Sequence, residues 1–364
     1  MAATYRIKLL AKALDEAGVQ SGVLCTRAID RPGSPRNNAA RGVDSGIWFE
    51  YTPGSSLRST TFVGRRWSAA RGFVVALRRL RTLRRQGRLD CVYVYGYASN
   101  WNFRSWALAH LTRLMRIPLV TDVVELPWGL KEKPSLVESR TSSLAPFSGA
   151  VSISEKLEIW AKGECSRTNK PYIGLRVPAL VDTREFPATV PVLAELQVLL
   201  SIAPEYVESV RFVRKAMESV WLAHPDCRLV VTGIDRADPH SAPILAAGVL
   251  DGDPRVVVAG YLSRADLAAA YQRSFALLAP LFGDPRSEAR FPTKIAEYLA
   301  AGRPVVTSKV GEIGRILRHG VTAMLAEPGD AESFAECIRS ILADGELAAR
   351  VASEGRSLAQ REFD

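Results

Sequence analysis

The sequence lacks several features that would assign it to a common functional class. No window supplies the roughly 20 uninterrupted apolar residues that a membrane-spanning helix requires. The five cysteines stand singly with no CxxC pair, so neither a zinc site nor a disulfide scaffold is indicated. No GxGxxG run occurs, which disfavours a dinucleotide-dependent oxidoreductase. Four dispersed histidines form no Ser-His-Asp or Cys-His pattern, which disfavours the corresponding hydrolases.

The composition is that of a folded protein. The 364 residues are 47% hydrophobic and 24% charged, which is enough for two ordinary α/β domains. Met1 is followed by a segment with helical spacing and charges, whereas a secretory signal would have a continuous apolar core. Together with the unpaired cysteines, this predicts a cytoplasmic protein.

The net charge of +10 is concentrated in the first half. Up to Pro187 there are 29 Lys and Arg against 15 Asp and Glu, and after it 19 against 23. Much of the excess lies between Arg65 and Asp90, in a predicted helix. One face of this helix is approximated by Trp67, Phe73, Leu77, Leu80 and Leu83.

Two interpretations of this basic helix are open. It is a solvated helix that covers a sheet, or it contacts an anionic membrane surface, which would place the protein peripherally at the inner face of the membrane. Nucleic acid is not expected as a partner, because no aromatic platform or reader motif accompanies the arginines.

Strand-like runs alternate with helical patterns along the chain. The predicted strands lie within residues 22–25, 46–52, 91–97, 117–128, 149–154, 196–204, 227–234, 254–262 and 275–282. This rhythm predicts an α/β fold with mostly parallel sheets. Prolines cluster between residues 177 and 196, which we interpret as a linker between domains of residues 1–182 and 183–364.

The segment from Arg290 to Leu317 contains the strongest candidate site. A predicted helix from Lys294 to Ala301 starts just after Pro292, and Gly302 follows it. A helix start presents unpaired N–H groups and partial positive charge, so it favours phosphate. Arg290 and Lys294 add cations there, and Glu297 can accept hydrogen bonds from sugar hydroxyls. The pattern predicts a nucleoside-diphosphate site.

The stretch "FPTKIAEYLAAGRPVVTSKVGEIGRIL", followed by "GVTAMLAEPGD", closely resembles the donor-site region of glycosyltransferase family 4, the group 1 glycosyltransferases. The resemblance implies a retaining hexosyltransferase of the GT-B fold, with two Rossmann-like domains facing a central cleft. It also implies a UDP- or GDP-linked sugar donor, a carbohydrate or lipid-linked acceptor, and a role in polysaccharide or glycoconjugate synthesis. We expect no metal or other cofactor.

The resemblance also implies roles for individual residues. Glu297 would bind the ribose hydroxyls and the turn at Gly260 and Tyr261 would flank the base. The diphosphate would be held by the loop of Phe291, Pro292, Thr293 and Lys294. We expect Arg290 and Lys294 to stabilise the charge that develops on the leaving phosphate.

In the first half, the resemblance makes Asp122 and Glu125 candidates for contacts with the acceptor and the sugar. Both residues lie in the stretch "IPLVTDVVELPW", which is predicted to form a strand and the loop after it. The weaker candidates in this half are Tyr97, Asn100 and Asn102.

Some positions depart from the family pattern. Ala289 stands eight positions before Glu297, where many members have a second glutamate, and Val207 stands where many have a cation. The first strand with its glycine loop and the last helix are expected to be missing. The alternative is therefore a catalytically impaired or truncated homologue that binds nucleotide sugars.

Overall fold

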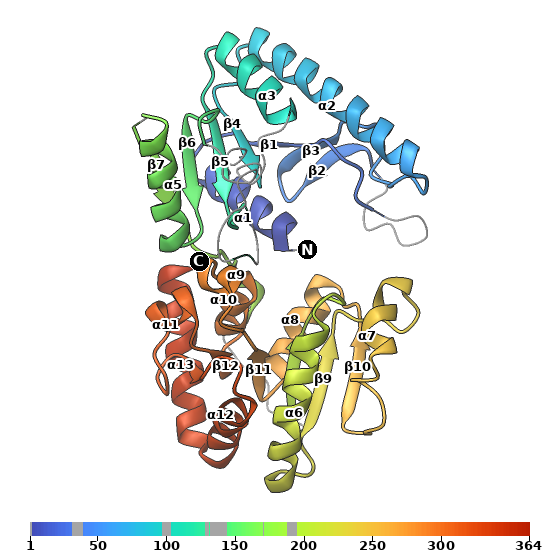
Figure 1. The fold of residues 1–364 in the computed structure, drawn as a ribbon, viewed down its shortest axis with the longest axis vertical. Helices are drawn as coiled ribbons and strands as arrows, with labels where there is room; N and C mark the ends of the chain where they lie inside the picture. The colour runs from blue at the N-terminus through green and yellow to red at the C-terminus, as the bar shows by residue number, and fades with distance from the viewer. Residues whose placement is uncertain are drawn as a thin grey trace. The chain divides into compact units, whose positions relative to one another are not determined.

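The computed structural model describes residues 2–30, 39–96, 103–127, 131, 144–169, 171–187 and 195–364. The chain divides into two compact units, and the second consists mainly of Val177–Asp364 (Figure 1). No described helix has both the length and the apolar character needed to span a membrane.

The described residues of the first unit form two small sheets. The strands of one, in the order β1-β3-β2, are β1 (Gly22–Cys25), β2 (Arg41–Asp44) and β3 (Ile47–Tyr51). The other is β4 (Val92–Tyr95), β5 (Leu119–Val123), β6 (Gly149–Ser152) and β7 (Gly174–Arg176), all parallel. The helices are α1 (Ala2–Glu16), α2 (Phe62–Arg85), α3 (Phe103–Leu114) and α5 (Glu155–Arg167). The expected alternation of strands and helices is present from β3 to β5 and from β6 to β7, whereas β1, β2 and β3 follow one another directly.

The antiparallel hairpin of β2 and β3 was not expected from the sequence. Its strands are joined by Ser45 and Gly46, which have φ values of 54° and 85°. Positive φ at both loop residues is typical of the tight hairpin turn that matches the twist of the flanking strands. The short polar strand RGVD has little strand propensity, so the turn and the pairing with β3 determine its conformation.

Helix α2 differs from the predicted pattern in one respect. Phe73, Ala76 and Leu80 are buried, whereas Trp67 is 73% exposed. At 3.6 residues per turn Trp67 lies roughly opposite to these buried residues. The prediction that Trp67 lies on one helical face with Phe73 and Leu80 is therefore wrong.

A buried ion pair connects α1 to the second of these sheets. Arg6 donates through Nε to Asp122 Oδ2 at 2.8 Å and through Nη2 to Oδ1 at 3.2 Å. The two side chains are 1% and 0% exposed. Because each charge is removed from water, each depends on the other for compensation. The pair therefore fixes α1 against β5.

The second unit contains one six-stranded parallel sheet in the order β10-β9-β8-β11-β12-β13. Its strands are β8 (Gln197–Ser201), β9 (Arg228–Thr232), β10 (Val256–Gly260), β11 (Ala276–Ala279), β12 (Val305–Ser308) and β13 (Met324–Ala326). This is the doubly wound order, in which the chain reverses direction across the sheet between the first and fourth strands. The reversal lies between β8 and β11.

Helices cover both faces of this sheet and make two hydrophobic cores. The helices are α6 (Val207–Ala223), α7 (Ala242–Ala246), α8 (Arg264–Arg273), α9 (Pro285–Ala289), α10 (Thr293–Ala300), α11 (Gly311–Ile316), α12 (Ala331–Ala343) and α13 (Gly345–Glu362). Along β8, Val198 and Leu200 join the core with α6 and α12, whereas Leu199 joins the core with α8, α10 and α13. Burial on both faces explains the continuous apolar runs of these strands.

The contacts divide the chain at Val177, before the predicted boundary between residues 182 and 183. Ala179, Val181 and Phe186 are buried in the second unit's core. The segment predicted as a linker therefore packs on that unit over these residues. The predictions of a missing opening strand and closing helix stay predictions.

We predict that Arg6→Ala destabilises the first unit by about 3–5 kcal/mol, because it leaves the Asp122 carboxylate buried without its partner. Hydrogen exchange of the β4–β6 amides under increasing urea would measure the loss in this unit alone.

Lys8→Ala is the matched control on the same helix. Lys8 pairs with Asp44, and both side chains are nearly half exposed. An exposed pair of this kind contributes at most about 1 kcal/mol. Equal losses for the two variants would contradict the assignment of Arg6.

Candidate functional site

The start of α10 is the centre of the candidate site. Pro292 is the residue that precedes the helix, and no side chain caps its first turn. Gly302 follows the helix with a φ of 70°, the left-handed conformation that commonly ends helices. The uncapped start leaves backbone N–H groups that favour an anion.

Two side chains of α10 hold the carboxyl end of β8. Tyr298 accepts a hydrogen bond from the Ser201 backbone N–H at 3.1 Å, and the Lys294 ammonium donates to the Ser201 carbonyl. The two residues are four positions apart, so they lie on one face of the helix. Burial lowers the pKa of Lys294 to about 8. The predicted cation is therefore engaged with the backbone.

This tie places α10 at a defined point of the sheet. Ser201 ends β8, the strand that borders the reversal of strand order. In open α/β sheets, ligands bind outside the carboxyl ends of the strands at this reversal. Helix α10 follows β11, which lies next to β8 and runs parallel to it. The start of α10 therefore lies at the same edge of the sheet, where the strands have their carboxyl ends.

Glu297 lies one turn into α10 and is buried. Its Oε1 pairs with Arg264 Nη1 at 3.1 Å, and Arg264 also donates through Nε to Glu185 Oε2 at 2.7 Å. Burial raises the pKa of Glu297, and the Arg264 guanidinium opposes this shift. Arg264 thus bridges two carboxylates and compensates the buried one.

The turn after β10 contains Gly260 and Tyr261. Gly260 has a φ of 74°, and its carbonyl accepts hydrogen bonds from the Gly233 N–H at 2.9 Å and the Thr232 hydroxyl at 3.0 Å. The Tyr261 ring is partly exposed, and its hydroxyl donates to Asp238 at 2.9 Å. The turn is fixed to the end of β9, and an aromatic face remains accessible beside it.

The loop before α10 is anchored by Phe291. Its ring is buried and lies 5.0 Å from the Phe363 ring, between centroids. Pro292 and Thr293 are half-buried, as is Arg290. The Arg290 Nε is buried with no hydrogen-bond partner among the residues that the structure describes. A buried donor without a partner is costly, so a ligand atom that accepted from this Nε would be stabilised there.

The candidates of the first unit have different environments. Asp122 is the fully buried partner of Arg6, so the prediction that it contacts an acceptor is not supported by this geometry. Its charge and burial raise the pKa of Tyr93, burial being the larger cause. Glu125 is half-buried just after β5. The weaker candidates Tyr97, Asn100 and Asn102 lie outside the described residues.

Three residues of the second unit's cluster were missed from the sequence: Arg264, Glu185 and Tyr298. One signal points to Arg264, which is the first residue of α8 after the Ser263 cap. A cation in the first turn opposes the helix dipole, so it indicates a specific acidic partner. The partner itself is not readable from sequence, because Glu185 and Glu297 are distant along the chain.

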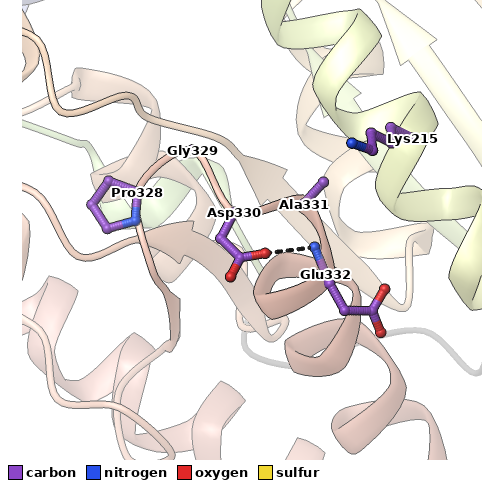
Figure 2. A pocket seen from close by; sticks show the side chains of 6 residues that line it. All are labelled: Lys215, Pro328, Gly329, Asp330, Ala331 and Glu332. Atoms are coloured by element: carbon purple, nitrogen blue, oxygen red, sulfur yellow. Dashed lines mark hydrogen bonds between the residues drawn. The ribbon is translucent and has the colours of Figure 1, made fainter.

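A pocket of about 430 Å³ opens elsewhere in this unit, between Lys215 of α6 and the start of α12 (Figure 2). Asp330 already caps that helix by accepting from the Glu332 and Ser333 N–H groups. None of the predicted donor-binding residues lines the pocket. Within the described ranges, no group of three or more His, Cys, Asp or Glu residues is placed to hold a metal ion.

We predict that Arg264 and Glu297 are coupled in stability. Arg264→Ala should cost about 1.5–3 kcal/mol, since it removes a charged hydrogen bond from a buried carboxylate. Glu297→Gln should cost less in that background than in the parent chain, with a coupling of about 0.5–3 kcal/mol. Urea unfolding of the parent, the two single variants and the double variant measures the free energies of unfolding that give this coupling.

The matched control is the exposed pair of Arg236 and Asp251, 2.9 Å apart on the same unit. Its cycle should show at most about 1 kcal/mol of coupling. If the Arg264 and Glu297 substitutions are additive, the bridge does not stabilise the site.

Sequence comparison finds relatives over part of the chain. Residues 197–344 match the family model described as glycosyl transferases group 1. A glycogen synthase of Mycobacterium tuberculosis is 30% identical over 168 residues, which cover 44% of this chain and 37% of that protein. A phosphatidyl-myo-inositol mannosyltransferase of Mycobacterium leprae is 27% identical over 146 residues, covering 40% and 37%. The match therefore spans little more than a third of each relative.

Structure comparison extends the similarity to both units. Sucrose-phosphate synthase from Thermosynechococcus elongatus has a TM-score of 0.70 at 17% identity, over 99% of this chain and 89% of that one. HepE of Anabaena, in complex with UDP-glucose, has a TM-score of 0.60 at 17% identity, over 88% and 83%. These likenesses confirm the GT-B fold. The resemblance of this chain to the group 1 glycosyltransferases is confirmed, and its sequence match lies in residues 197–344.

Proposed function

We propose that the chain transfers a hexosyl group from a nucleoside-diphosphate sugar to a hydroxyl acceptor. One observation carries the proposal: the uncapped start of α10 at Thr293 lies three residues after Arg290, whose buried Nε has no partner among the described residues. Backbone N–H groups, a helix dipole and an unsatisfied guanidinium donor are the features that bind a diphosphate.

The rest of the nucleotide has partners around the same edge of the sheet. Glu297 lies in the same helix and would accept hydrogen bonds from the ribose hydroxyls through its carboxylate, which also pairs with Arg264. The partly exposed Tyr261, on the turn with Gly260, would flank the base. These roles are the ones that the family resemblance implied for the three residues.

The chemistry requires that the site stabilise the departing diphosphate. Cleavage of the sugar–phosphate bond develops negative charge on the β-phosphate, and preorganised N–H groups lower the barrier by binding that charge. Arg290 and the backbone from Phe291 to Lys294 would supply these donors. Lys294 already donates to Ser201, so its contribution would be its positive charge.

The relatives support the donor class. The Anabaena protein is described with UDP and with UDP-glucose, and the mycobacterial relatives are named as a glycogen synthase and a mannosyltransferase. We therefore propose a UDP- or GDP-linked hexose as donor and a carbohydrate or lipid-linked acceptor, in polysaccharide or glycoconjugate synthesis. Retention of the anomeric configuration and independence from metal stay predictions.

We predict that UDP or GDP binds the chain and that Glu297→Ala weakens this binding roughly ten-fold or more. The physical reason is the loss of a charged hydrogen bond, which costs about 1.5–3 kcal/mol. Isothermal titration calorimetry measures the affinity. Glu297→Gln retains the side-chain volume and should also bind more weakly.

Glu218→Ala is the control, because this glutamate is exposed on α6 three turns after the start of the helix. It should leave the affinity unchanged. Unchanged affinity in both Glu297 variants would refute the assignment of Glu297. Binding with no transfer or hydrolysis of any hexose donor would instead favour the alternative, a homologue that binds nucleotide sugars without catalysis.

A further inference from the structure

Helix α2 of the first unit has an unusual composition. Its 24 residues contain eight arginines and no acidic residue. The helix begins at Phe62, after the Thr61 hydroxyl that accepts a hydrogen bond from the Gly64 N–H, and it ends at Arg85. It is therefore a long cationic helix with a defined start, whose inner face packs on the unit through Phe73, Ala76 and Leu80.

The face opposite this packed side exposes apolar side chains. Val63 is 75% exposed, Trp67 73% and Val74 47%. At 3.6 residues per turn these three residues fall within about 40° of one another around the helix. Phe62, at the helix start, is 63% exposed. Single apolar side chains are common on protein surfaces, but exposed apolar side chains gathered in one patch mark a site of interaction with a protein or a membrane.

Arginines continue the same stripe toward the end of the helix. The exposed residues on this side of the helix are here called the outer stripe of α2. They are Val63, Trp67, Arg71, Val74, Arg78, Arg81 and Arg85. No carboxylate lies within ion-pair distance of Arg71, Arg78, Arg81 or Arg85 in the described part of the chain, although Arg79, toward the packed side, pairs with Glu50. The positive charge of the stripe is thus uncompensated by described residues.

Apolar and aromatic residues beside arginines, in one outward stripe, have the chemistry of a bilayer interface. Tryptophan is favoured at the level of the headgroups, and arginine binds their phosphates. We propose that the outer stripe of α2 docks the first unit onto a bilayer containing anionic phospholipid, with Trp67 inserted between headgroups. This inference does not depend on the proposed donor site, which lies in the other unit.

The charge and the apolar residues of the outer stripe favour an anionic bilayer over a neutral bilayer or a nucleic acid. A neutral bilayer would leave the arginines without counter-charge. A nucleic acid would satisfy the arginines but would leave the valines of the outer stripe without an apolar environment. An anionic bilayer is the surface that matches both kinds of residue along one stripe.

The test is sedimentation of the full chain with vesicles. The chain should bind vesicles of phosphatidylcholine mixed with phosphatidylglycerol, and not vesicles of phosphatidylcholine alone. Binding should fall as salt is raised to about 1 M, where the Debye length is about 3 Å. Binding to both vesicles alike, or to neither, overturns the proposal.

Two matched pairs of variants assign the contact to α2. Replacing Arg71, Arg78 and Arg81 by Gln should weaken binding to anionic vesicles by about five-fold per charge. Replacing Arg273, Arg350 and Arg361, three exposed arginines of the second unit, changes the net charge equally and should have little effect. Equal losses in the two triple variants would show that only net charge matters, which overturns the assignment to α2.

The second pair tests insertion of the aromatic ring. Trp67→Ala should weaken binding roughly ten-fold, whereas Trp106→Ala, at another exposed tryptophan of the same unit, should not. Far-UV circular dichroism confirms that each variant is folded. A Trp67 variant that binds as tightly as the parent, or tighter binding of the chain to short duplex DNA than to the anionic vesicles, overturns the proposal.

Discussion

The attachment of α10 to the end of β8 is the contact on which the candidate site depends. Both backbone groups of Ser201 are bound by side chains from one face of this helix, Tyr298 and Lys294. The next residue, Ile202, donates its N–H to the Thr232 carbonyl at the end of β9. Hydrogen bonds at the ends of β8 and β9 therefore link the start of α10 to the turn after β10 at the reversal of strand order.

The buried carboxylate of Glu297 is compensated by Arg264, a residue that the sequence did not predict as part of the site. Glu297 is needed in the proposed function as an acceptor for sugar hydroxyls, yet its burial opposes ionisation. Arg264 supplies the compensating charge and is itself held by Glu185, from the segment that enters the unit. Arg264 thus favours the charged form of Glu297, and in the proposed function it would be a positioning residue for that carboxylate.

The sequence predicted the strands and helices well, because buried parallel strands have continuous apolar runs and α10 has clear start and stop residues. It did not reveal contacts between residues distant along the chain. Arg6 and Asp122, or Arg264 and Glu297, become partners only after the fold forms. Trp67 was assigned to the wrong face because apolar character was taken to mean burial, and α2 carries apolar residues on both sides.

The proposed function depends on a nucleoside diphosphate binding at the start of α10. Hydrogen–deuterium exchange of the full chain, with and without UDP or GDP, tests it most directly. The account predicts slower exchange at residues 291–297 and at the turn of Gly260 and Tyr261, with no change at the start of α12. Protection at the α12 pocket alone, or no protection by either nucleotide, would contradict it.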